Sequence, residues 1–163
     1  MSTNTKPTIP AKKTAKPKDA IALLRADHQE VAAMFAQVAN TTSPVKKKAL
    51  VSQICTALSV HAQVEEEIFY PAVKQALKDK LLVPEAIVEQ ATMKALIDQV
   101  NGVEPDGEMY DARVTVLAEY VKHHVKEEHT EMFPKAKASK LDLVELGARL
   151  TDRKRELMAQ RAL

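Results

Sequence analysis

The chain has 163 residues with a net charge of +2; 45% of them are apolar, 28% are charged, 4% are aromatic and only three are glycine. This composition suits one soluble domain and offers too few turn formers and aromatic residues for a typical β-sandwich or β-barrel. The single cysteine excludes an intramolecular disulfide and a zinc ribbon, and no apolar run reaches the ~18 residues of a membrane-spanning helix.

The first 18 residues differ from the rest, with five lysines, three prolines and no acidic residue. They lack the apolar stretch and cleavage site of a secretory signal, so we expect a cytoplasmic protein without a membrane partner. Such a segment buries too little apolar surface to fold, which predicts a disordered tail at residues 1–18 and one folded domain at residues 19–160. The alternative is a weak anchor for nucleic acid or anionic lipid, but no arginine or aromatic residue would add specific contacts, which makes a nucleic-acid partner unlikely to be the main one.

Two helices are predicted in the first half of the chain. The first begins after Asp19 and has one face made of Ile21, Leu24, His28, Val31 and Phe35. Asn40 to Thr42 form a break, after which Ser43 and Pro44 predict a new N-cap and first turn. The second helix has the face Val51, Ile54, Leu58, His61, Glu65 and Ile68. Pro71 should kink or end it, with a short continuation to Leu77.

Three further helices are predicted in the second half. The third has Pro84 near its start and the face Val83, Ile87, Gln90, Met93 or Lys94, Ile97 and Val100. A loop at residues 101–107 leads to the fourth, with the face Val114, Leu117, Val121, His124, Glu128 and Met132, which we expect Pro134 to stop. A fifth, shorter helix fits Leu141 to about Ala159. The predicted fold class is therefore all-α: an antiparallel up-down four-helix bundle, with the extra C-terminal helix across an end or flank.

Each of the four long faces contains polar residues where a core is expected: His28, His61 with Glu65, Gln90, and His124 with Glu128. Burying an uncompensated carboxylate costs several kcal/mol or more, so these residues need partners. A single histidine of this kind is usually satisfied by a backbone carbonyl, and a single His-x3-Glu pair is usually a solvated ion pair. Their repetition on several apolar faces favours a common explanation.

The second and fourth helices carry the same frame, H-x3-E-x5-P, at His61, Glu65 and Pro71 and again at His124, Glu128 and Pro134. Residues four apart share a helix face, and these two helices run in the same direction in an antiparallel bundle. The two His-Glu pairs can therefore face each other in the core. Imidazoles and carboxylates there would form a site for two divalent metal ions, with each glutamate able to bridge both.

The segments DAIALLRADHQEV, HAQVEEEIFYP and HHVKEEHTEMFP resemble the hemerythrin-like HHE cation-binding domain family. LDLVELGARLTDRK also resembles the helix that follows this domain in bacterial members, so the resemblance covers roughly Asp19 to Met158. It implies a four-helix bundle with a non-haem diiron centre. By the family's pattern, the iron ligands are His28, His61, Glu65, His124 and Glu128, with the two glutamates as bridges.

The chain departs from the family's pattern on the third helix, where Gln90 stands in place of a usual histidine. Its amide oxygen is a poorer iron ligand, so we include Gln90 only as an optional one and expect two unequal metal positions. We expect the ion beside His28 and His124 to be held better than the ion beside His61 and Gln90. His129 should point away from the site on an ideal helix, although a loosened helix before Pro134 would let it reach the metal.

The resemblance implies a protein that binds iron as two ions, the second held weakly, and that binds or senses O₂, NO or peroxide. One alternative is an enzyme that acts on peroxide or repairs nitrosative damage at the same centre. Another is an interaction protein with a degraded metal site, whose basic tail provides the contacts. The sequence leaves the oligomeric state open.

Overall fold

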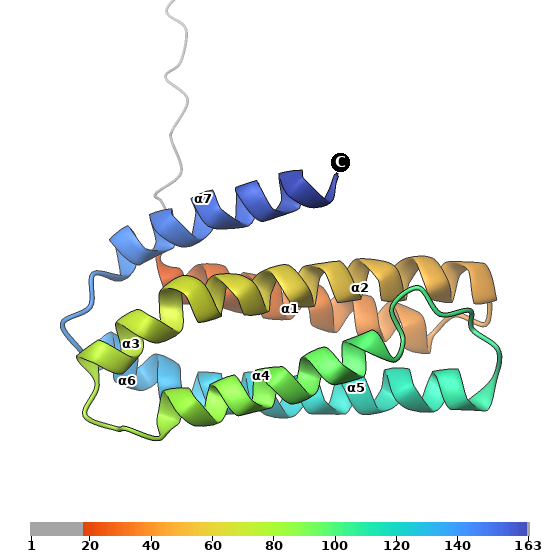
Figure 1. Ribbon diagram of the computed structural model, residues 1–163, viewed down its shortest axis with the longest axis horizontal. Helices are drawn as coiled ribbons and strands as arrows, with labels where there is room; N and C mark the ends of the chain where they lie inside the picture. The colour runs from red at the N-terminus through yellow and green to blue at the C-terminus, as the bar shows by residue number, and fades with distance from the viewer. Residues whose placement is uncertain (1–17, 163) are drawn as a thin grey trace, which may run out of the picture.

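The computed structural model describes residues 18–162, and nearly all of them lie in helices. The helical elements are α1 (Ala20–Ala39), α2 (Pro44–Val64), η1 (Glu65–Phe69), α3 (Tyr70–Ala76), α4 (Leu82–Asp98), α5 (Glu108–Glu127), η2 (Glu128–Met132), α6 (Phe133–Ala138) and α7 (Leu143–Arg161). The elements α2, η1 and α3 form one bent rod, and α5, η2 and α6 form another. With α1 and α4 these rods make an antiparallel four-helix bundle (Figure 1), which confirms the predicted fold class.

Three helices begin at polar caps that the sequence supplies. The side chain of Asp19 accepts a hydrogen bond from the backbone N–H of Ala22 at 2.8 Å, and Ser43 does the same for Lys46 at 3.3 Å. Asp142 caps α7 in the same way. These caps satisfy backbone donors that a helix start leaves unpaired, and they set the starts of α1 and α2 where the sequence predicted them.

Two wide helical turns, η1 and η2, occupy the corresponding places in the two rods. Each is π-helical, with the N–H of the residue after the turn donating to the carbonyl of its first residue, Glu65 or Glu128. Helical structure resumes beyond each turn. Pro71 therefore bends its helix without ending it, as expected, whereas the expectation that Pro134 stops the fourth helix was wrong, because α6 continues to Ala138.

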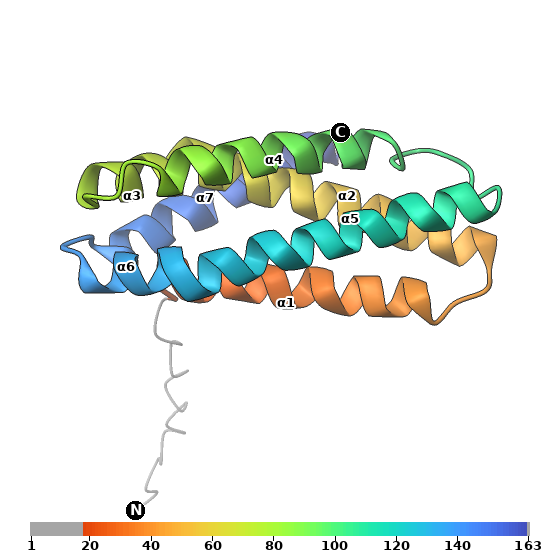
Figure 2. The same ribbon diagram turned by 90° about the horizontal axis from the view of Figure 1, so that it is seen from below.

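The C-terminal helix α7 lies along one flank of the bundle, against α1, α2 and η1 (Figure 2). Gly147 makes this close approach possible, because a Cβ atom built there would lie 2.6 Å from the carbonyl oxygen of Lys18. A side chain at this position would push α7 away from the start of α1. The flank position agrees with the predicted place of the fifth helix.

The apolar core consists of two clusters, one toward each end of the bundle. The first includes Leu24, Val64, Ala86 and Met132, and the second includes Val31, Leu58, Met93 and Val121. Along each long helix, the polar residues of the predicted faces fall between a member of one cluster and a member of the other. The bundle therefore brings all of them to one depth, where two apolar layers shield them from solvent.

Some predicted core positions differ from the structure by one residue. Ile87 is 45% exposed, and its neighbour Ala86 is buried instead. Phe35 is only half-buried, whereas Met34 and Val38 are buried. The wide turn η1 shifts the helix face, so Phe69 replaces Ile68 in the core. The predicted tail lies outside the described residues except for Lys18, and no helix within those residues has the length and apolar character to cross a membrane.

Candidate metal centre

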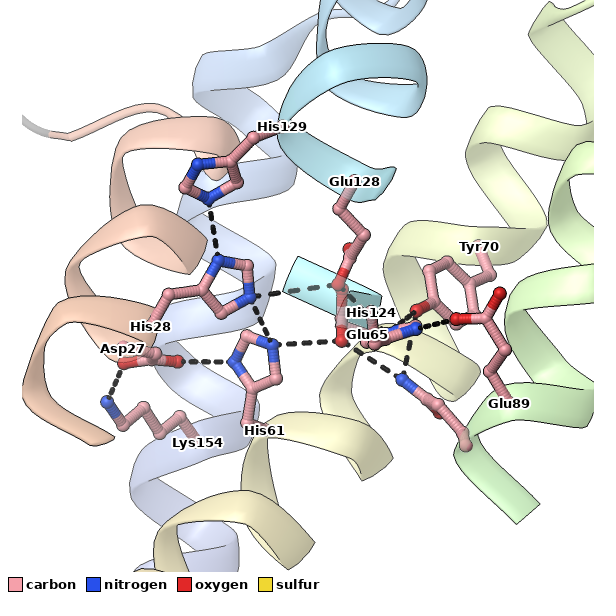
Figure 3. A network of polar contacts seen from close by, with 11 residues as sticks. Asp27, His28, His61, Glu65, Tyr70, Glu89, His124, Glu128, His129 and Lys154 are labelled. Atoms are coloured by element: carbon pink, nitrogen blue, oxygen red, sulfur yellow. Dashed lines mark hydrogen bonds and ion pairs between the residues drawn. The ribbon is translucent and has the colours of Figure 1, made fainter. Parts of the chain in front are cut away.

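Three histidines from three helices turn their Nε2 atoms toward one point in the core. His28 comes from α1, His61 from α2 and His124 from α5, and their exposed fractions are 8%, 5% and 3%. The Nε2 atoms of His28 and His61 lie 3.0 Å apart, and the Nε2 atom of His124 lies 3.0 Å from Oε1 of Glu128. Three ring nitrogens therefore converge on the same carboxylates (Figure 3).

The other ring nitrogen of each of these histidines points outward to a partner. Nδ1 of His61 lies 3.0 Å from Oδ2 of Asp27, whose other oxygen is paired with Lys154 at 2.5 Å. Nδ1 of His124 lies 2.6 Å from Oε2 of Glu89. A carboxylate at Nδ1 keeps the proton there and leaves the lone pair of Nε2 free, which is the arrangement of a metal-binding histidine.

Glu65 and Glu128 supply buried carboxylates with too few partners. Their exposed fractions are 0% and 2%, and Oε2 of Glu65 and both oxygens of Glu128 receive no well-formed hydrogen bond. The amide oxygen of Gln90 is also buried without a partner. Buried acceptors of this kind are costly unless something satisfies them. The donor set of imidazole nitrogens and carboxylate oxygens fits divalent first-row metal ions, which would supply the missing positive charge.

The pKa values of the buried groups also indicate that the centre would stabilise a bound cation. Burial and the neighbouring Glu65 carboxylate raise the pKa of Glu128 to about 8. Burial would lower the pKa of His124, but its contact with Glu128 raises that pKa to about 9. Burial and the charge of His61 lower the pKa of His28 to about 3. The two carboxylates thus compete for ionisation unless positive charge lies between them.

Gln90 occupies the place on α4 that faces the two carboxylates. Its Nε2 donates to Oε1 of Glu65 and to the Tyr70 hydroxyl, both at 3.0 Å. The Tyr70 hydroxyl in turn lies 3.2 Å from Nε2 of His124. At the position where the family's pattern has a histidine, α4 therefore contributes the side-chain amide of Gln90. This amide also holds the Tyr70 hydroxyl in place.

The structure groups the candidate ligands differently from our expectation. One set of donor atoms comes from His28, His61 and Glu128, and the other comes from Glu65, His124 and Glu128. We had paired His28 with His124, and His61 with Gln90. The correction follows from the neighbours in the bundle, because α1 packs mainly against α2 whereas α4 packs mainly against α5. All five predicted ligands and Gln90 do lie together, and Glu128 belongs to both sets.

His129 reaches the centre as well, against the expectation for an ideal helix. Its Nε2 lies 2.8 Å from Nδ1 of His28, so it contacts the outer side of that ring. The wide turn η2, which begins at Glu128, loosens the helix ahead of Pro134 and accompanies this contact. His129 is not in either set of converging donor atoms.

The sequence analysis did not assign roles to Asp27, Glu89 and Tyr70. Two of them carry a recognisable signal, because Asp27 directly precedes His28 and Glu89 directly precedes Gln90. An acid at such a position lies beside the inward face and can reach the outward nitrogen of a histidine on the next helix. Tyr70 has no such signal, because its placement depends on the wide turn η1.

Comparisons with known proteins agree with this geometry. The sequence model of the family described as hemerythrin HHE cation binding domain matches residues 19–136. A protein of Nostoc sp. described as a DNA nickase is 32% identical over 111 residues, which are 68% of this chain but only 31% of the nickase. A crystal structure of a hemerythrin HHE cation-binding-domain-containing protein from Mycobacterium kansasii has a TM-score of 0.75 at 20% identity, over 88% of this chain and 89% of that chain, and shows the same fold.

Proposed function

Because this chain belongs to the hemerythrin HHE cation-binding domain family, we propose that its buried centre holds two iron ions and binds or senses O₂, NO or peroxide. The observation that supports the proposal best is the convergence of three imidazole Nε2 atoms on two buried carboxylates, three of whose four oxygens lack a well-formed hydrogen bond. Such a donor set inside a four-helix bundle suits a pair of carboxylate-bridged metal ions. Iron in this setting would supply reversible binding and redox chemistry toward small oxygen and nitrogen species.

The protein's own residues have distinct tasks in this proposal. His28 and His61 would bind one ion and His124 the other, with Glu128 contacting both and Glu65 lying beside His124 and His61. Asp27 and Glu89 hold two of the rings in their orientation. The two apolar clusters keep bulk water from the centre, which strengthens the electrostatic interactions inside it.

The space beside the centre favours a very small ligand. A cavity of about 10 Å³ adjoins the three histidines, and its other walls are mostly aliphatic: Val31, Leu58, Met93, Val121 and Val125. A volume near that of one water molecule suits a diatomic molecule or peroxide and excludes larger organic substrates. Its apolar walls also favour ligands that water holds weakly.

The test is the metal content and optical spectrum of freshly purified protein, followed by anaerobic addition of NO and by addition of O₂ or peroxide. We expect iron at between one and two ions per chain and near-ultraviolet charge-transfer bands that respond to at least one of these ligands. Protein that retains no iron after anaerobic reconstitution would contradict the proposal. Iron-loaded protein that binds none of the three ligands would contradict the ligand part of it.

The same experiment separates the alternative functions. Steady consumption of peroxide or NO over many turnovers would identify an enzyme at this centre. Protein that binds no metal but binds nucleic acid with a strong salt dependence would identify an interaction protein. The likeness to the Nostoc nickase adds one measurement, the nicking of supercoiled plasmid with and without iron, although this chain spans about a third of that relative.

A further inference from the structure

A pocket of about 70 Å³ opens beside the buried centre, between α4 and the rod formed by α5 and η2. Each of its walls carries two acids spaced four residues apart: Glu85 and Glu89 on α4, and Glu127 and Glu131 on the rod. Residues at this spacing share a helix face, so the four acids face one pocket. Within residues 18–162 none of them forms an ion pair with a lysine or arginine. The pocket therefore has concentrated negative charge.

Two of the acids that line this pocket, Glu89 and Glu127, place ligand atoms close to those of the neighbouring His123. Glu89, His123 and Glu127 each contribute one ligand atom, and these three atoms lie within 4.8 Å of one another. Nε2 of His123 lies 3.1 Å from Oε1 of Glu127. The side chains of His123 and Glu127 are 61% and 44% exposed, so a hydrated ion can reach them from solvent. Two carboxylates and an imidazole are ligands that Fe²⁺, Mn²⁺ and Zn²⁺ accept.

The inner end of the same pocket contains an unsatisfied buried ligand. Glu128 lines the pocket, is 2% exposed, and has no well-formed hydrogen bond to either carboxylate oxygen. The ring of His124 separates it from the outer acids, with Nδ1 at Glu89 and Nε2 at Glu128 (Figure 3). An ion that enters this pocket therefore meets the exposed donors first and the buried carboxylate next.

We propose that Glu89, His123 and Glu127 form an outer divalent-cation site, at which a metal ion binds before it passes through this pocket to Glu128. The loading role rests on the proposed function of the buried centre, whereas the outer site itself does not. With only three protein ligands, two of them exposed, the outer site should bind weakly and exchange quickly. A site that hands its ion inward requires both properties.

The outer site is tested with Mn²⁺, whose free form is measured by electron paramagnetic resonance during titration of the full-length protein as purified. The double variant His123→Gln and Glu127→Gln removes the two exposed ligands and leaves Glu89, which also contacts His124, in place. We expect wild type to bind one more weakly held Mn²⁺ per chain than the double variant. Glu119→Gln, an exposed acid on the same helix, is the matched control and should behave as wild type. Coinciding titrations of wild type and double variant would overturn the outer site.

The loading role is tested by mixing metal-free protein with Fe²⁺ anaerobically and following uptake with time. We expect the double variant to load several-fold more slowly than wild type or Glu119→Gln but to reach the same final occupancy, because the buried ligands are unchanged. Equal rates would overturn the loading role even if the Mn²⁺ titrations differ. If neither protein takes up iron while the Mn²⁺ titrations differ, the proposed function fails and the outer site stands.

Discussion

The two sides of the buried centre carry the same motif but have different surroundings. On the histidine-rich side, His28 and His61 face each other, with His129 and Asp27 behind them. On the amide side, His124 lies with Gln90 and Tyr70, and Glu89 is behind it. The H-x3-E pairs of the two bent rods are alike, so the difference comes from α1 and α4, which contribute an imidazole and an amide respectively. The residues on α1 and α4, which lack the H-x3-E motif, thus determine whether the two metal positions have similar ligands.

The largest effect on metal content is expected from a substitution at Glu65, which contacts both sides of the centre. Glu65→Ala should remove metal from both, because Glu65 contacts His61 at 2.9 Å and belongs to the donor set of His124. The stabilisation that bound metal gives should vanish too, and an ion present at 100 times its dissociation constant contributes about 2.7 kcal/mol. Metal content and the melting temperature before and after chelation measure both effects.

The control for this variant is Glu66→Ala, which removes the neighbouring carboxylate that pairs with Lys94 at the surface. It should keep its metal, since surface ion pairs contribute little. If Glu65→Ala retained full metal occupancy, the two sides would not share this carboxylate.

Gln90→His should make the two sides more alike. In wild type we expect the amide-side ion to leave first on mild chelation, because Gln90 offers a neutral oxygen in place of an imidazole. The variant should hold this ion at least roughly tenfold more tightly, since even partners outside the ligand shell change metal affinity 10–100-fold. Chelator competition gives the two affinities.

Gln90→Leu separates the effect of the new imidazole from the loss of the amide. It should weaken the amide-side ion further and leave the histidine-rich side unchanged. Two equally tight ions in wild type, unaffected by Gln90→His, would show that Gln90 is only a hydrogen-bonded core residue.

Asp27→Asn should weaken the histidine-rich side selectively. The carboxylate fixes the orientation and proton position of His61, and loss of such a partner costs about 10–100-fold in affinity. Lys154→Gln tests the next partner outward and should have a smaller effect, because the lysine side chain is 43% exposed. Chelator competition again measures the result, and equal weakening of both ions by Asp27→Asn would contradict the independence of the two sides.

The smallest effect concerns the stability of chelated protein, to which His28 and His124 should contribute with opposite pH dependence. The pKa of His28 is lowered from 6.5 to about 3, so its contribution is lost as pH falls below about 6.5. The pKa of His124 is raised from 6.5 to about 9, so its contribution is lost as pH rises from about 6.5 to 9. The pKa of Glu128 is raised from 4.5 to about 8, so its contribution is lost as pH rises from about 4.5 to 8.

Denaturant titrations of chelated protein between pH 4 and pH 9 should therefore show greatest stability between about pH 4.5 and 6.5, where the changes from His28 and Glu128 cancel, and a loss above pH 6.5. Metal-loaded protein should have its maximum at higher pH, because metal ligands must release their protons. Stability of the chelated form that rises steadily to pH 9 would contradict the assigned protonation of His124.

Much of this architecture was predictable because helix periodicity is a local property. The caps at Asp19 and Ser43, the apolar faces and the repeated frame indicated four long helices and placed the polar residues of the centre on their inward sides. Which histidine lies beside which was not predictable in this way. It depends on whether α1 is nearer to α2 or to α5, and the periodicity of a single helix contains no information about its neighbours.

Two departures from the ideal-helix expectation, at His129 and at Phe69, have a shared physical cause. An ideal helix of 3.6 residues per turn aims His129 away from the centre and places Ile68 in the core. The wide turns change that period locally, so His129 contacts His28, and Phe69 is buried. We expected Pro71 to kink or end its helix and Pro134 to stop its helix; the chain passes through both prolines, with a wide turn ahead of each.

These wide turns also act as spacers that set which aromatic ring faces the centre. Tyr70 and Phe133 stand at the same place in the two frames, five residues after Glu65 and Glu128, and both are almost fully buried. In a regular α-helix, the residue five positions on would lie about 140° away from the glutamate. Deleting a single residue from either turn would close it to a regular α-turn, in which that ring, now four positions after the glutamate, would lie about 40° from it. Each wide turn therefore accommodates one residue more than a regular turn would while keeping the ring on the glutamate's side of the helix.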